Sequence, residues 1–216
     1  DAAEVAAVAV HYHQNKGAAD AVIESIKAKG KGSAAFQADL LAEAQARELI
    51  HRVEKEFGRI DILVNDFGPF ITKPWQELTG QDWEGILRGT LLSAFYGTQE
   101  ALPGMRQRGW GRVINIGYSR AEQLASFPGI LPYAVAKTGL LTVTRTAAAS
   151  EVGHGITVNM VSPGLMKGGA MPQSKNIPEQ AVGEFKDVAE AVFFLASDRA
   201  SAVTGTNLIV SGTWKM

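Results

Sequence analysis

The chain has 216 residues, of which 46% are hydrophobic and 23 are glycine, and this composition fits one globular domain rather than a disordered or fibrous protein. The formal net charge of -1 leaves no basic surplus for nucleic acid or anionic lipid. Cysteine is absent, which excludes disulfides, thiolate metal sites and cysteine nucleophiles, and no apolar run approaches the ~18 residues of a membrane span.

Short apolar runs rich in Val and Ile alternate with longer amphipathic segments along the whole chain. Strands are predicted at 4–12, 33–39, 60–65, 111–117, 156–161 and 208–210. Helices are predicted at 18–29, about 42–57, about 82–105, from Tyr133 onward and at 186–197. Gly30 and Gly58 are expected to stop the first two helices, and Pro103 to bend or end the third. The alternation predicts an α/β fold, with a doubly wound parallel sheet between two helical layers.

The helix after strand 111–117 opens with Tyr133-Ala-Val-Ala-Lys137. This spacing places a phenol and an ammonium one helical turn apart, beside the strand ends where an α/β sheet holds its ligand. At about 5 Å and an effective dielectric of about 20 the attraction is about 3 kcal/mol, so Lys137 is expected to lower the pKa of Tyr133 by about two units. The pair is predicted to handle protons on a carbonyl or an alcohol.

Further motifs occur at matching places along the chain. They are Asp39-Leu40, Asn65-x-x-Gly68, Leu102-Pro-Gly-Met105, Tyr133 with Lys137, Asn159 with Pro163-Gly164, and Val203-Thr-Gly205. With these motifs the chain resembles the short-chain dehydrogenase/reductases over nearly its whole length, and within them the β-ketoacyl carrier-protein reductases. The resemblance implies a Rossmann-type sheet of seven strands in the order 3-2-1-4-5-6-7.

The family's first strand and its glycine-rich phosphate loop have no counterpart in the chain, which starts where the second strand should be. Without that strand, the sheet centre would contain a slot of roughly 9.6 Å with two rows of unpaired backbone groups. We therefore expect about 30 residues before Asp1, so that 1–216 is a single NAD(P)-binding domain that is incomplete at its N-terminus. Segment 165–180 is shorter than the family's usual substrate lid and is a candidate place for a chain break.

The resemblance implies that Tyr133 protonates the carbonyl oxygen of a ketone as hydride arrives from a nicotinamide. It also implies that Lys137 tunes the phenol and holds the nicotinamide ribose. The family's catalytic asparagine marks a helix irregularity, and here its place falls on Thr90. Thr90 is expected to substitute for it in part.

The serine that holds the substrate oxygen in this family is out of register here. Counting back from Tyr133 leads to Ser119, whereas counting forward from Ile116-Gly117 puts Tyr118 in the serine's place. We select Ser119, because its small hydroxyl both donates and accepts, and keep Tyr118 as the alternative.

The strand end that selects the cofactor carries His11-Tyr12-His13-Gln14-Asn15-Lys16, with no acid to accept the ribose hydroxyls of NAD. This favours NADPH, with His11, His13 or Lys16 as the partner of the 2′-phosphate. No metal is expected, because the two histidines have no third ligand. By resemblance the other cofactor contacts are Asp39 and Leu40 at the adenine, Asn65 and Gly68 at the adenosine ribose, and Pro163 and Gly164 at the nicotinamide.

The leading prediction is a cytoplasmic enzyme that uses NADPH to reduce a ketone in a small or carrier-linked substrate. The helix from Tyr133 is small or apolar on more than one face, which favours a homo-oligomer, a tetramer in the family. Nucleic acid and membrane are not expected as partners. Two alternatives are a catalytically silent NAD(P)-binding protein and an oligomeric scaffold that no longer binds cofactor.

Overall fold

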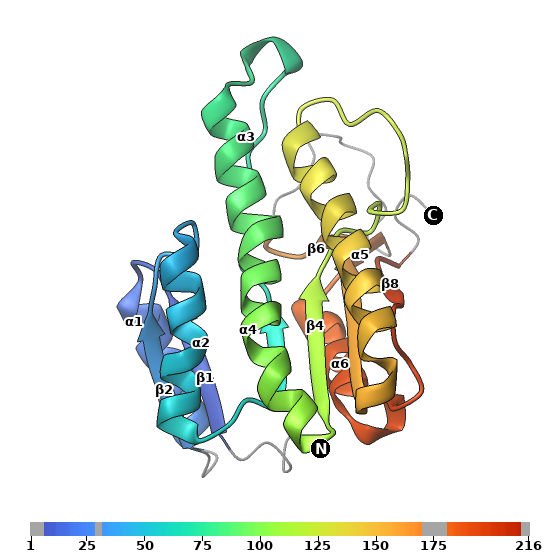
Figure 1. Ribbon diagram of the computed structural model, residues 1–216. Helices are drawn as coiled ribbons and strands as arrows, with labels where there is room; N and C mark the ends of the chain where they lie inside the picture. The colour runs from blue at the N-terminus through green and yellow to red at the C-terminus, as the bar shows by residue number, and fades with distance from the viewer. Residues whose placement is uncertain (1–6, 29–31, 170–180, 213–216) are drawn as a thin grey trace.

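The computed structural model describes residues 7–28, 32–169 and 181–212. A layer of parallel strands is covered by α2, α4 and α5 on one face and by α1 and α6 on the other (Figure 1). The predicted doubly wound α/β architecture is therefore confirmed. The predicted element ends at residues 4–6, 29 and 30, and most of segment 165–180, lie outside the described residues.

The elements follow the predicted alternation. The strands are β1 (Ala7–Tyr12), β2 (Gly32–Gln37), β3 (Ile62–Asn65), β4 (Gly111–Ile116), β5 (Ile156–Pro163), β6 (Leu165–Met166), β7 (Val182–Gly183) and β8 (Asn207–Val210). The α-helices are α1 (Lys16–Lys27), α2 (Glu43–Phe57), α3 (Gly80–Ile86), α4 (Ser93–Arg108), α5 (Leu131–Glu151) and α6 (Phe185–Ala196). Gly58 ends α2 with a φ of 79°. None of the helices in the described ranges is both long and apolar enough to cross a bilayer.

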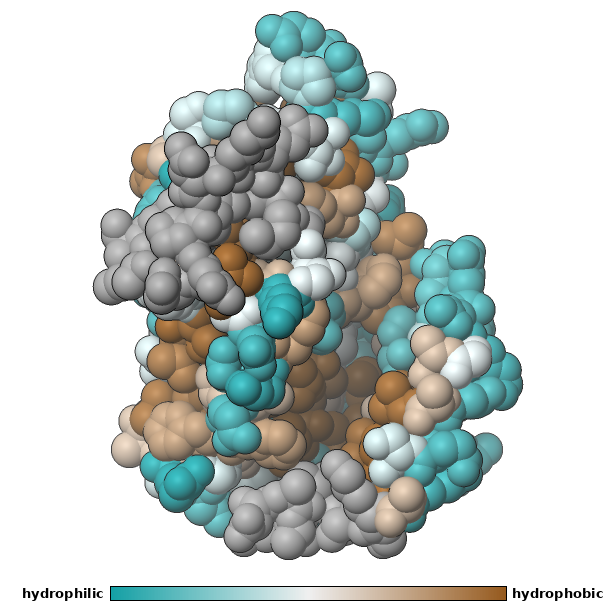
Figure 2. All heavy atoms as spheres, turned by 180° about the vertical axis from the view of Figure 1, so that it is seen from behind, coloured by the Kyte–Doolittle hydropathy of each residue, from teal (hydrophilic) through white to brown (hydrophobic). Residues whose placement is uncertain are grey.

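The strand layer is interrupted between β1 and β3. β1 pairs with β2, whereas β3, β4, β5 and β8 form a second sheet in that order, and no ladder between described residues joins the two. On the face that carries α1 and α6, Figure 2 shows a hollow with hydrophobic side chains along it. Val22 of α1, Val64 of β3 and Phe193 of α6 are 42 to 48% exposed on these elements. The interruption lies where the slot was predicted, and the segment expected before Asp1 stays a prediction.

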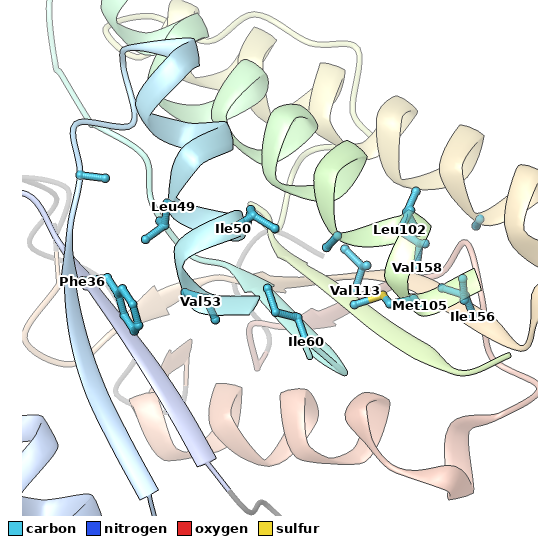
Figure 3. Close-up of a cluster of buried hydrophobic side chains, with 13 residues drawn as sticks. Phe36, Leu49, Ile50, Val53, Ile60, Leu102, Met105, Val113, Ile156 and Val158 are labelled. Carbon is cyan, nitrogen blue, oxygen red and sulfur yellow. The ribbon is translucent and has the colours of Figure 1, made fainter. Parts of the chain in front are cut away.

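Side-chain packing joins the two sheets without a hydrogen-bond ladder. Phe36 of β2 and Leu49 and Val53 of α2 belong to the same buried cluster as Met105 of α4 and Val113 of β4 (Figure 3). α2 can reach both sides because its apolar residues recur at helical spacing and form one continuous face. The core therefore fixes the position of the β1–β2 pair relative to the larger sheet.

The long helix predicted at 82–105 consists of α3, a π-helical segment at Leu87–Leu92, and α4. The prediction that Pro103 bends or ends this helix was wrong about its end, because α4 continues to Arg108. Proline has no backbone N–H, so Pro103 leaves the carbonyl of Gln99 without its helical donor. Both residues lie on the exposed face of α4. Leu102 and Met105 stay buried, so core packing holds the helix through the proline.

An ion pair ties the end of α4 to the end of α5. Arg106 Nε donates to Glu151 Oε2 at 2.8 Å, and a second guanidinium nitrogen donates to Oε1 of the same fully buried carboxylate. This pairing holds the pKa of Glu151 below its usual range. Arg106→Met is expected to lower the free energy of unfolding at neutral pH by about 2 kcal/mol, because it leaves a buried carboxylate without its main partner. Chemical denaturation measures this change.

The double variant Arg106→Met/Glu151→Gln is the control, and it should regain part of the loss because no buried charge remains. A carboxyl whose folded pKa is lowered adds stability above its unfolded pKa of about 4.3, and this stability is lost as the pH falls through the folded value. The difference between wild type and Arg106→Met should therefore shrink in acid. A difference of the same size at about pH 3 and about pH 7 would contradict the assignment.

Candidate active site

The carboxyl ends of β3, β4 and β5 lie side by side beneath the start of α5. Asn65 is in register with Asn115, and Ile116 with Val161. Pro132 stands in the first turn of α5, where a fixed φ suits the start of a helix and no backbone donor is lost. Tyr133 and Lys137 therefore stand on the first two turns of α5, over this edge of the sheet (Figure 1).

The Lys137 side chain reaches from α5 to the end of β4. Its ammonium donates to the carbonyl of Ile116 at 2.5 Å and lies 5.6 Å from the centroid of the Tyr133 ring. The side chain is 4% exposed. Burial lowers the pKa of Lys137 to about 8, while the nearby Asp66 carboxylate opposes that change. The predicted pairing of phenol and ammonium is present in space.

The direction predicted for the pKa of Tyr133 was wrong for this chain. Burial raises the pKa of Tyr133 to about 12, and the Tyr118 phenol and the Asp66 carboxylate add to the increase. The phenolate loses water contacts in the buried site, and this cost exceeds the attraction that sequence spacing alone suggested. The ammonium that was expected to compensate is bound to Ile116. Tyr133 is a neutral phenol at pH 7, with its proton available for donation.

Aromatic rings surround Tyr133 on more than one side. Phe70, in the loop after β3, meets the Tyr133 ring at 5.0 Å between centroids and an interplanar angle of 87°. Tyr118, in the loop after β4, meets it at 5.6 Å and 65°. Phe127 lies 6.3 Å from Tyr118 on the same loop. These rings exclude water from the phenol, which explains the direction of its pKa.

Two buried hydroxyl groups next to this cluster have no hydrogen-bond partner among the described residues, those of Thr90 and Ser119. Thr90 lies in the π-helical segment, so the helix irregularity expected at this residue is present. A methyl group added to Gly68 would come within 2.9 Å of the Thr90 hydroxyl, which brings two predicted site residues together. Buried polar atoms in proteins are normally paired. Two free hydroxyls in one region suit a site that a ligand completes.

A row of amides and hydroxyls crosses the site beneath the strand ends. Asn65 Nδ2 donates to Asn115 Oδ1 at 2.8 Å and to Thr98 Oγ1 at 3.2 Å, and Asn115 Nδ2 donates to Thr144 Oγ1 at 2.9 Å. Asn65 was predicted to bind the adenosine ribose, and its amide nitrogen is committed to this network. Asn115 and Thr144 were missed by the sequence reasoning. An asparagine inside the apolar run Gly111–Ile116 was the available signal, because a buried amide needs partners.

The residues predicted for the adenosine end of the cofactor lie at the end of β1, across the interruption of the sheet. His11 Nε2 is hydrogen-bonded to the carbonyl of Ala38 at 2.9 Å, and its ring contacts Phe67 edge-on. Asp39 Oδ1 accepts from the backbone of Leu41 and closes a turn. His11 also borders a pocket of about 500 Å³ between β1 and α1. Leu40 is partly buried and packs against the main core cluster.

Pro163 and Gly164, at the end of β5, are hydrogen-bonded to the loop after β4 and to the end of β8. The carbonyl of Pro163 accepts from the backbone of Ser119 at 3.0 Å, and the backbone of Gly164 donates to Val210 at 3.0 Å. A methyl group on Gly164 would lie 2.5 Å from Cβ of the buried Ser211. Only glycine therefore fits where β5 ends beside β8.

The whole chain matches a family model described as "Enoyl-(Acyl carrier protein) reductase", over residues 2–214. It is 35% identical over 214 residues to the 3-oxoacyl-[acyl-carrier-protein] reductase FabG of Staphylococcus epidermidis, a match that covers 95% of this chain and 87% of that protein. The chain belongs to the short-chain dehydrogenase/reductases.

Two further relatives support this membership of the short-chain dehydrogenase/reductases. FabG of Haemophilus influenzae is 32% identical over 206 residues, covering 90% of this chain and 82% of that protein. A solved structure of a blue fluorescent protein from a metagenomic library, in complex with NADPH, is 33% identical, with a TM-score of 0.89. That match covers 100% of this chain and 90% of the other. The predicted resemblance is thereby confirmed, including its closeness to the 3-oxoacyl reductases.

This short-chain dehydrogenase/reductase is an oxidoreductase, of the kind that reduces ketones with a nicotinamide cofactor. Its own residues fit such a group. Thr90 and Ser119 carry buried hydroxyls that lack a partner among the described residues. The pocket beside His11 adds room at the far end of the sheet edge.

Proposed function

We propose that this chain reduces a ketone to an alcohol with NADPH, and that Tyr133 is the general acid. The observation that carries the proposal is the position of Tyr133 and Lys137 on the first turns of α5, with the Lys137 ammonium bound to the end of β4. This arrangement fixes a neutral phenol and a cation at the sheet edge where α/β proteins bind ligands.

Bound NADPH would supply the hydride that adds to the carbonyl carbon. As the C=O π bond breaks, the oxygen takes the proton of the Tyr133 phenol and becomes the hydroxyl of the product. Lys137 stabilises the resulting phenolate through its positive charge, which it carries below a pH of about 8. Thr90 is assigned to the path by which the Tyr133 phenolate regains its proton. Its hydroxyl lies in the helix irregularity and has no partner among the described residues.

NADPH is proposed over NADH because the end of β1 presents His11 and His13 and no carboxylate. The NADPH complex of the metagenomic relative supports the same choice. Lys16, the third candidate for the 2′-phosphate, forms an exposed ion pair with Asp20 at 2.7 Å. Asp39, Leu40, Asn65 and Gly68 are proposed to border the adenosine half. Pro163 and Gly164 are proposed to shape the nicotinamide pocket.

We expect NADPH to bind at least about tenfold more tightly than NADH in a fluorescence titration. His11→Asp should remove most of this preference, because a carboxylate repels the 2′-phosphate and accepts the ribose hydroxyls of NAD. His11→Asn is the matched control, since it loses the same ring without adding charge, and it should keep more of the preference. Equal affinity of wild type for the two cofactors would contradict the assignment.

The proposed substrate is a 3-oxoacyl compound or another small ketone, free or linked to a carrier, as the names of the relatives suggest. A homo-oligomer is proposed as well. Val135 of α5 and Phe95 of α4 are exposed on the helices that would form the contact.

The second candidate function is a catalytically silent NAD(P)-binding protein. Three departures from the family pattern favour it: Thr90 stands in place of the asparagine, the serine is displaced in register, and the segment after Pro163-Gly164 is altered. Tight NADPH binding without oxidation, across a panel of ketones that includes 3-oxoacyl thioesters, would establish it.

A further inference from the structure

Tyr118 is the first residue beyond β4 whose side chain reaches Tyr133. We propose that the Tyr118 hydroxyl is the second hydrogen-bond donor to the substrate's carbonyl oxygen, beside Tyr133, and that it replaces the serine hydroxyl of related enzymes. This inference rests on the proposed function, because it assigns a residue of the same site. From the sequence we selected Ser119 for this role and kept Tyr118 as the alternative, and we now prefer Tyr118.

The backbone on both sides of Tyr118 is fixed. The amide of Gly117 donates to the carbonyl of Val161 at 2.7 Å, and the amide of Ser119 donates to Pro163 at 3.0 Å, so the segment follows the end of β5. The carbonyl of Tyr118 accepts from Ala121 at 2.8 Å and closes a turn. A donor held in this way loses little conformational entropy when a substrate binds.

The Tyr118 ring is also held from the side. It meets Phe127 at 6.3 Å and 65°, and the guanidinium of Arg120 lies 4.7 Å from the Phe127 centroid. Its other neighbour is Tyr133 itself, at 5.6 Å and 65°. The ring therefore stands between a supporting aromatic wall and the acid that protonates the substrate.

The rings of Tyr118 and Tyr133 are neighbours, with their centroids 5.6 Å apart. The Tyr118 phenol also contributes to the raised pKa of Tyr133. A carbonyl oxygen that accepts from Tyr133 would thus lie near a second phenol. Two donors to one oxygen stabilise the negative charge that develops there during hydride addition.

Ser119 has a different environment. Its hydroxyl is buried, it has no hydrogen-bond partner among the described residues, and its amide is bound to Pro163 at the end of β5. Aromatic contacts hold the Tyr118 ring against Tyr133, whereas no hydrogen bond among the described residues orients the Ser119 hydroxyl. We therefore assign the donor role to Tyr118, whose ring the aromatic cluster holds in place.

The test compares Tyr118→Phe, which keeps the ring and removes the hydroxyl, with Ser119→Ala and with the matched control Tyr96→Phe. Tyr96 lies on α4, where its ring contacts Phe95 and Arg47. The readouts are kcat and KM for NADPH-dependent reduction of an acetoacetyl thioester. A third measurement, which needs no turnover, is the binding of that thioester in the presence of NADP by calorimetry.

Tyr118→Phe is expected to lower kcat by about 100-fold, the usual cost of losing one donor to a developing oxyanion. It should weaken thioester binding in the NADP complex by about tenfold, as for a single hydrogen bond. Ser119→Ala should cost less in both measurements, and Tyr96→Phe should leave both unchanged. A structural role of the ring alone would leave Tyr118→Phe close to wild type.

The proposal is overturned if Tyr118→Phe keeps kcat and binding within about twofold of wild type, or if Ser119→Ala causes the larger loss. A wild-type protein that binds the thioester without reducing it would contradict the proposed function instead. In that case a tenfold weaker binding to Tyr118→Phe supports the donor role, and unchanged binding overturns it. An ultraviolet titration of the cofactor-free protein adds a check, since Tyr118→Phe should lower the pH at which Tyr133 ionises.

Discussion

Tyr133→Phe is expected to lower kcat for ketone reduction by about 1000-fold, within the usual range for the loss of a general acid. The variant keeps the ring and its contacts with Phe70 and Tyr118, so the loss would report the proton alone. Because burial raises the pKa of Tyr133 to about 12, the phenol keeps its proton throughout the neutral range. The measurement is the steady-state oxidation of NADPH with an acetoacetyl thioester.

Two control measurements separate the loss of the proton from other effects of the substitution. NADPH affinity should change by less than about threefold in Tyr133→Phe, which separates chemistry from cofactor binding. Tyr96→Phe, the same change at a distance on α4, should keep the activity of wild type. Activity of Tyr133→Phe within about twofold of wild type would refute the role of Tyr133 as acid and, with it, the proposed mechanism.

Lys137→Met is expected to lower kcat by about 100-fold, because the phenolate left by proton transfer would have no nearby cation to stabilise it. The pH dependence gives a second signature. Burial lowers the pKa of Lys137 to about 8, so its charge is present below that pH and is lost as the pH rises through it. The wild-type rate should therefore fall above a pH of about 8. Lys137→Met should lack this decrease.

The same variant should make the protein more stable at neutral pH. A lysine whose folded pKa lies below its unfolded pKa of about 10.4 destabilises the fold wherever it is charged in both states, which here means below a pH of about 8. Methionine has a similar shape and no charge to bury, so the free energy of unfolding should rise in Lys137→Met at pH 7. Lys27→Met on α1, where the lysine is exposed, is the control and should change little. Lower stability together with lower activity would indicate that Lys137 is a structural residue.

Local patterns predicted the parts of this structure that depend on nearby residues. The amphipathic pattern of residues 42–57 predicted α2, whose apolar face is buried, and Gly58 marked its end. The apolar runs predicted β4 and β5, which are buried along nearly their full length. Pro103 is the exception, because burial of Leu102 and Met105 holds α4 together beyond a residue that ends most helices.

The site divides in the same way. The i, i+4 spacing of Tyr133 and Lys137 is a property of the helix and could be read directly. The choice between Ser119 and Tyr118 depended on where the loop after β4 turns, and sequence counting gave two answers. Asn115 was missed because its partners, Asn65 and Thr144, come from other elements.

The sequence by itself determined the order of elements, the family, and the residues that can donate or accept a proton. Tertiary structure decided the burial, the hydrogen bonds and the pKa values of those residues. The pKa of Tyr133 rises instead of falling because rings from two loops remove water from it, and the Lys137 ammonium binds to Ile116. Helix spacing fixes the separation of two groups along one element, whereas desolvation depends on every segment that packs around them.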